Sequence, residues 1–129
     1  MTESTSYLVG IKSRLVASSA VVSVEVVQEH ALPDRGYFRA RLTLANSDFL
    51  EVAEYFVVEE GLCQTIRYRY QWMDQSKQVL KKRWDNVEHF PGLPNFPHHV
   101  HEGEESLAEP GRSVSIVELI DLIEQELAC

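Results

Sequence analysis

The strongest constraint on the fold is an alternation of apolar and polar residues, with a period of two, that runs from residue 21 to residue 85. Successive side chains of a β-strand point to opposite faces, so this alternation predicts strands with one buried and one solvated face. Turn-forming residues interrupt it at 33–36, 46–48, 60–61 and 73–76. The strands that we predict between these turns cover residues 21–28, 37–45, 49–59, 62–72 and 78–85.

A helical pattern flanks the strands on both sides. Residues 4–18 place Leu8, Ile11 and Leu15 on one stripe of a helix. Residues 115–127 open with a Ser-x-x-Glu capping box and carry a second apolar stripe. Five strands joined by short turns favour an antiparallel meander, and the end helices can cover one face of it. The predicted class is therefore α+β: an antiparallel β-sheet of about five strands with an N-terminal and a C-terminal helix packed on it.

Residues 86–112 break both patterns. They hold four of the five prolines in the chain, together with glycines and histidines. Closely spaced prolines disfavour continuous helix or central strand, so we expect a long loop here, and long loops in small domains are often functional. The chain has 129 residues, which is the length of one domain, so we predict a single domain over 1–129.

The charge is unevenly distributed along the chain. The net charge is −8, but from residue 96 onward eight acidic residues accompany one basic residue, whereas the first 95 residues hold 11 Lys and Arg against 12 Asp and Glu. Local potential steers a ligand, so the net charge does not exclude a nucleic-acid partner. The two cysteines cannot form a disulfide framework, and we find neither a membrane-length apolar run nor a secretion signal. We expect a cytoplasmic protein with reduced thiols and no membrane contact.

Three of the five histidines lie at positions 98, 99 and 101. A pair of imidazoles can hold one proton donor and one acceptor near neutral pH, as a metal-independent ribonuclease requires. In an extended segment, His99 and His101 share a face and His98 points away. The same pair could instead bind a divalent metal ion with Asp85 or Glu51, the less favoured option, since no third ligand is tied to the pair by local spacing. The histidines could also be solvent-facing loop residues without a role. We predict no cofactor.

A second cluster of polar residues ends the last predicted strand. Arg83, Asp85 and Asn86 surround Trp84, which is expected to pack in the core. Asp85 would orient a histidine and Arg83 would neutralise a phosphate, a division of roles common in acid–base sites. Alternatively, Asp85 and Asn86 simply turn the chain.

Arginines recur on the polar face of two predicted strands, at Arg39 and Arg41 and at Arg67 and Arg69. Alternate residues on neighbouring strands can align into one basic band, and guanidinium groups bind phosphate well. Glu51 and Glu54 on the adjoining strand could instead pair with these arginines as surface salt bridges. The opposite face of the second arginine strand would carry Ile66, Tyr68, Tyr70 and Trp72.

The order of these parts resembles the TumE-type toxins of toxin–antitoxin modules. The pieces that carry the resemblance are residues 49–52 (FLEV) with Glu54, 68–70 (YRY), 83–86 (RWDN), 96–101 (FPHHVH) and the closing acidic helix. The resemblance implies a small toxin encoded beside a helix-turn-helix antitoxin, acting on RNA as an endoribonuclease. It also implies a site at Asp85, Asn86, His98, His99 and His101, with Tyr68 and Tyr70 near it.

Three hypotheses for the function follow. In the first, an RNA-cleaving toxin, His99 and His101 (or His98) act as acid and base, and Asp85 sets an imidazole tautomer. Arg83 with Arg67 or Arg69 then stabilises the phosphorane, while Asn86, Tyr68 and Tyr70 help to bind RNA. The second is a non-catalytic interaction module that binds a protein through its acidic tail and sheet edges. The third is a metal-dependent hydrolase. The exposed sheet edge would also permit a homodimer.

Overall fold

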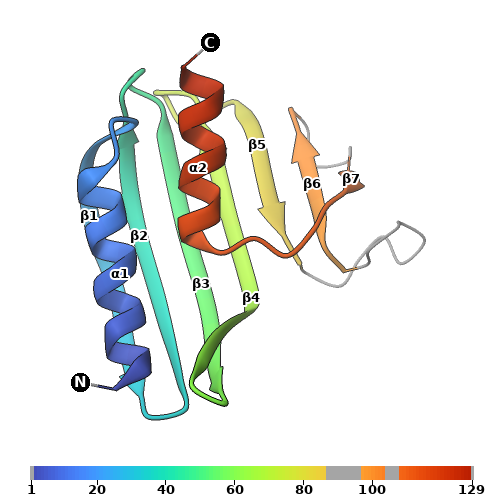
Figure 1. The fold of residues 1–129 in the computed structure, drawn as a ribbon. Coiled ribbons are helices and arrows are strands. Elements are labelled where there is room, and N and C mark those ends of the chain that lie inside the picture. Colours follow the sequence, from blue (N-terminus) through green and yellow to red (C-terminus); the bar gives the residue numbers. More distant parts are fainter. Residues whose placement is uncertain (1, 87–96, 104–107, 129) are drawn as a thin grey trace.

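The computed structural model describes residues 2–86, 97–103 and 108–128 (Figure 1). Two helices, α1 (Glu3–Ala17) and α2 (Ile116–Leu127), enclose the strands in the chain order. The strands are β1 (Val21–Leu32), β2 (Arg35–Leu44), β3 (Phe49–Glu59), β4 (Leu62–Met73), β5 (Leu80–Asp85), β6 (His99–Glu102) and β7 (Ala108–Pro110). No helix within these described residues is long and apolar enough to cross a bilayer.

The strands form one antiparallel sheet in the order β1-β2-β3-β4-β5-β6-β7, so each strand pairs with its neighbour in sequence. The predicted α+β class and the meander are confirmed. The loop prediction for 86–112 is wrong in two places, since β6 and β7 lie inside it. Pro97 precedes β6 and Pro110 ends β7, so the prolines flank the strands and remove no hydrogen bond from the middle of the sheet. Residues 87–96 of the predicted loop lie outside the described part, and the single-domain organisation stays a prediction.

Both helices pack on the same face of the sheet (Figure 1). The predicted stripe of Leu8, Ile11 and Leu15 is buried under α1. In α2, Ser115 and Glu118 form the predicted capping box, and Ile116, Leu119, Ile120 and Ile123 are buried. The sheet contributes alternate residues to this core, among them Phe38, Leu42, Val52, Tyr70 and Trp84. We call this side the helix face and the other side the open face.

A bulge in β4 corrects one predicted orientation. Tyr55 pairs with Arg67 and Phe56 with Thr65, so Ile66 is an extra residue in β4. Thr65 therefore turns toward the helix face, and Ile66, expected in the core with Tyr68, is 45% exposed. One inserted residue reverses the alternation on one side of the bulge.

Glu54 occupies a core position of β3 and is fully buried. Its carboxylate accepts hydrogen bonds from the Tyr7 hydroxyl of α1, the Thr65 hydroxyl of β4 and the Ile116 amide at the start of α2. Glu54 therefore links both helices to the sheet. The alternative that Glu54 forms surface salt bridges with the arginines is wrong, because its side chain points to the helix face. Burial is the main cause of its pKa being raised above the usual 4.5, although the three donors oppose the shift.

This raised pKa predicts how Glu54 affects stability as the pH changes. Between the usual value of 4.5 and the folded-state pKa, the native chain binds a proton that the unfolded chain does not. The contribution of Glu54 to the free energy of unfolding therefore increases as the pH falls through this window. Urea denaturation from pH 7 downward should show wild type gaining stability relative to Glu54→Gln.

The matched control is Glu124→Gln. Hydrogen bonds from Arg14 and Ser18 lower the pKa of Glu124, so its contribution has the opposite sign and is lost on acidification. If wild type loses stability relative to Glu54→Gln as the pH falls, the assignment of Glu54 is wrong.

Candidate functional site

The pairing of β5 with β6 brings the two polar motifs together. Arg83 lies opposite His101, and Asp85 lies opposite His99. Directly opposed residues of antiparallel strands point to the same face, so all four side chains gather on the open face. The intervening pair, Trp84 and Val100, points to the helix face and packs against the core. We call Arg83, Asp85, His99 and His101 the Asp85 cluster.

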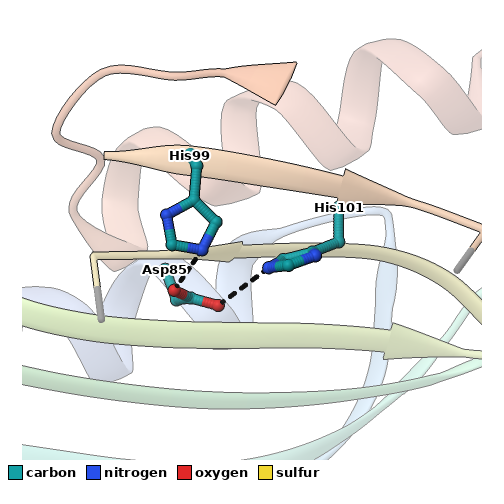
Figure 2. A group of neighbouring side chains, drawn as sticks. All are labelled: Asp85, His99 and His101. Carbon is teal, nitrogen blue, oxygen red and sulfur yellow. Dashed lines mark ion pairs between the residues drawn. The ribbon is translucent and has the colours of Figure 1, made fainter. Parts of the chain in front are cut away.

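Asp85 lies at the centre of this cluster (Figure 2). One carboxylate oxygen, Oδ1, is 2.8 Å from His99 Nε2. The other, Oδ2, accepts a hydrogen bond of 2.9 Å from Arg83 Nε and lies 3.6 Å from His101 Nε2. All four residues are buried, from 0% exposed for His101 to 6% for Arg83. A buried carboxylate is stable only with charged or hydrogen-bonding partners, and here both oxygens have them.

The two ring nitrogens of His99 have different neighbours. His99 Nδ1 is 2.8 Å from the Pro97 carbonyl oxygen, which can only accept, so Nδ1 donates this hydrogen bond. His99 Nε2 is 2.8 Å from Asp85 Oδ1, and this contact is an ion pair when the ring carries a proton on both nitrogens. His99 Nε2 therefore faces an acceptor.

His101 has the opposite arrangement. Its Nε2 is 3.2 Å from Arg83 Nη2, and a guanidinium group can only donate. His101 Nε2 therefore accepts the hydrogen bond and carries a lone pair. The two rings meet edge to face, with centroids 4.7 Å apart. The cluster thus holds two imidazoles on either side of one carboxylate, one with Nε2 facing an acceptor and one with Nε2 facing a donor.

The same side chains are a candidate site for a metal ion. One ligand atom from each of Asp85, His99 and His101 can be chosen such that all three lie within 4.8 Å of one another. Arg83, however, donates hydrogen bonds to Asp85 Oδ2 and to His101 Nε2. A cation would have to displace this positive group from two of the three ligands, so the donor set fits a metal poorly. Glu51, the other carboxylate considered, lies on β3 and bonds to Arg39 at 2.9 Å.

His98 is not part of the cluster. As the alternation predicts, it points away from His99 and His101, and it contacts Tyr68. Its Nδ1 is 3.0 Å from the Tyr68 hydroxyl and the two rings are stacked at 5.9 Å. Burial, followed by the neighbouring His99, lowers the pKa of His98 below its usual 6.5. His98 is therefore mainly neutral at pH 7.

Tyr68, Tyr70 and Asn86 hold backbone in place. The two tyrosines are buried on the helix face, where their hydroxyls donate to the carbonyls of Arg112 and Val114, ahead of α2. The Asn86 side chain accepts from the Tyr68 amide and donates to the Ile66 carbonyl at the β4 bulge. The structure does not bring these side chains to the Asp85 cluster, although Asn86 follows Asp85 directly.

Arg67 and Arg69 are exposed on the open face, where Arg69 lies directly opposite Asp85. A groove of about 350 Å³ lies on this face beside the cluster. Its lining includes Tyr37, Arg39, Ala53, Tyr55, Arg67 and Arg69. Tyr37 shares the face of Arg39 in the alternation of its strand, but no role was predicted for it or for Tyr55. Their cross-strand pairing was the missing signal.

Comparison with known proteins gives one match. The family model described as toxin TumE matches residues 11–128, which is nearly the whole chain. No curated protein and no solved structure matches.

The central position of Asp85 predicts a large effect of its removal. Asp85→Ala leaves the buried Arg83 guanidinium and His99 without their carboxylate, so the free energy of unfolding should fall by about 3–5 kcal/mol. Urea denaturation measures the loss, and hydrogen exchange of the Val100 and His101 amides should show faster opening of β6.

Asp121→Ala is the control. Asp121 pairs with Arg14 on the surface and its side chain is 58% exposed, so its removal should cost less than about 1 kcal/mol. Equal losses for the two variants would mean that the Asp85 cluster does not anchor β6.

Proposed function

The chain belongs to the TumE toxin family, and from this premise we propose that it is an endoribonuclease that uses histidine acid–base catalysis. Membership of a toxin family implies an antitoxin partner. The observation that carries the proposal is the pair of imidazoles, His99 and His101, that lie on either side of Asp85. Cleavage of RNA by its own 2′-hydroxyl requires one base and one acid, held on either side of the phosphate.

In the proposed mechanism, His101 Nε2 takes the proton from the 2′-hydroxyl, whose oxygen then attacks phosphorus. The bond from phosphorus to the 5′-oxygen breaks, and the protonated His99, turned from Asp85 Oδ1 toward the phosphate when RNA binds, donates its Nε2 proton to that oxygen. The products are a 2′,3′-cyclic phosphate and a 5′-hydroxyl. Proton exchange with water then restores both rings. Asp85 orients His99 and stabilises its charged form, as a carboxylate does for a catalytic imidazolium.

Arg83 has two roles in this proposal. In the free protein it donates to His101 Nε2, which keeps that nitrogen unprotonated. When a phosphate is bound, its guanidinium group would turn to the phosphate oxygens and stabilise the charge of the phosphorane. Arg69, opposite Asp85 on β4, would contact the adjacent phosphate. The cluster is buried, so the proposal includes an opening of the sheet at β5 and β6 when RNA binds.

That burial also favours a second candidate, in which the chain is a non-catalytic interaction module. The cluster would then only hold β6 against β5, and toxicity would come from binding a protein.

The other features of the sheet fit either candidate. β1 is an edge strand with Val26 and Leu32 partly exposed, and we propose this edge for a homodimer. The resemblance supports a helix-turn-helix antitoxin, and an RNA substrate supports a cytoplasmic location.

The test is the cleavage of structured and unstructured RNA by purified protein, with and without EDTA. Replacing His99 or His101 with Ala should lower the cleavage rate by about 10²–10⁴-fold, because the acid or the base is lost. Cleavage by wild type should persist in EDTA and leave cyclic phosphate ends. Circular dichroism of each variant shows whether the fold is intact.

Lys12→Ala is the control, because Lys12 lies on α1, on the other side of the sheet, where it pairs with Glu29. It should cleave at the wild-type rate. The acid–base proposal is contradicted if the folded double variant His99→Ala, His101→Ala cleaves RNA as well as wild type does. Loss of activity in EDTA, restored by one divalent ion, would instead identify the metal-dependent hydrolase.

A further inference from the structure

The register of the sheet arranges the open face into three rows that cross the strands. The first row is aromatic and basic, the second has a small residue, Ala53, between two arginines, and the third is polar. The second and third rows continue across β5 and β6 into the Asp85 cluster. In strand order, the rows are Tyr37–Tyr55–Arg67, Arg39–Ala53–Arg69–Asp85–His99 and Arg41–Glu51–Gln71–Arg83–His101.

The groove of about 350 Å³ follows from this arrangement. Ala53 contributes only a methyl group, and larger side chains surround it in its own row and in both neighbouring rows. The floor of the groove is therefore low at Ala53, with Tyr55 and Tyr37 along one side. The volume is at the lower end of the range of small-molecule sites. It suits a single planar ring system rather than an extended ligand.

The lining has the chemistry of a site for a nucleobase and its phosphates. Tyr37 and Tyr55 are direct cross-strand neighbours, both half-buried, and the exposed Arg67 continues their row. Aromatic rings and guanidinium planes are the surfaces on which proteins stack unpaired bases. Glu51 bonds to Arg39 at 2.9 Å and neutralises part of the charge. Arg67 and Arg69 remain on the groove as exposed cations.

We propose that this groove binds one unpaired base of single-stranded RNA, stacked on Tyr55 and Tyr37, with the flanking phosphates on Arg67 and Arg69. This inference rests on the proposed function, since it names the substrate class and the surface that presents it. Ala53, Arg69 and Asp85 lie on consecutive strands, so the groove is about 10 Å from Asp85 at the usual strand spacing of about 4.8 Å. His99 lies one strand beyond Asp85, so the RNA chain would continue from the groove over Arg69 and place a following phosphate at the cluster.

The proposal excludes duplex RNA as the preferred ligand. A base that is paired and stacked in a helix cannot enter a groove on the face of a sheet, whereas the base of a single strand turns out at little cost. Ribose, in turn, is needed only at the cluster, where the 2′-hydroxyl reacts.

The experiment measures binding apart from cleavage. A fluorescent single strand of 2′-O-methyl RNA, which lacks the attacking hydroxyl, is titrated with protein at one fixed salt concentration and its anisotropy is recorded. The same strand annealed to its complement is the duplex probe. Wild type should bind the single strand at least about tenfold more tightly than the duplex, because only unpaired bases can stack on the tyrosines.

Replacing Tyr37 and Tyr55 together with Ala should weaken binding of the single strand by about 5- to 100-fold, the range for losing one stacked base. Replacing both with Phe retains the rings and should change affinity by less than about twofold. Lys12→Ala is the matched control, because it removes a cation from α1 on the helix face and should leave binding unchanged.

Two outcomes separate this inference from the proposed function. If wild type cleaves unmodified RNA and the Tyr37→Ala, Tyr55→Ala variant binds and cleaves like wild type, the groove assignment is overturned and the nuclease stands. If the tyrosine variant loses binding but wild type does not cleave unmodified RNA, the groove assignment is supported and the nuclease is overturned. Equal binding of single strand and duplex also overturns the groove assignment.

Discussion

The pairing of β6 with β5 is the constraint on which the site depends. It places His99 opposite Asp85 and His101 opposite Arg83. The alternate pair, Trp84 and Val100, packs on the helix face. The side chains of the two polar pairs must therefore point to the open face. A shift of the register by one residue would reverse both sets and bury charged groups under the helices. Core packing and the geometry of the cluster are therefore set by one register.

The two faces of the sheet carry different groups. The helix face holds the core, the Glu54 carboxylate and acidic side chains of α2. There Arg14 pairs with Asp121 and Glu124, and Lys82 pairs with Glu126 and Glu102. The open face holds the groove and the Asp85 cluster with their arginines. A net charge of −8 is thus compatible with the proposed binding of RNA, because the acidic α2 lies on the helix face whereas Arg67 and Arg69 lie on the open face.

Much of the fold could be predicted because its signals are local. The alternation with a period of two predicted the first five strands, and apolar residues at helical spacing predicted α1 and α2. The alternation also predicted that His99 and His101 share a face. The strand β6 could not be predicted, since its four residues lie in a proline-rich segment and form a strand by pairing with β5 and β7. The bulge at Ile66 does not interrupt the alternation in the sequence, so it could not be predicted. The burial of Glu54 could not be predicted either, because its three hydrogen-bond donors come from distant segments.

The central claim is the proposed assignment of His99 as the acid and His101 as the base beside one carboxylate. Heteronuclear NMR of the histidine ring nitrogens at neutral pH tests it most directly, because it reports which nitrogens carry a proton. The account predicts that His99 is protonated on both nitrogens and that His101 carries a proton on Nδ1 alone. A His99 ring with one proton, or a His101 ring protonated on Nε2, would contradict it.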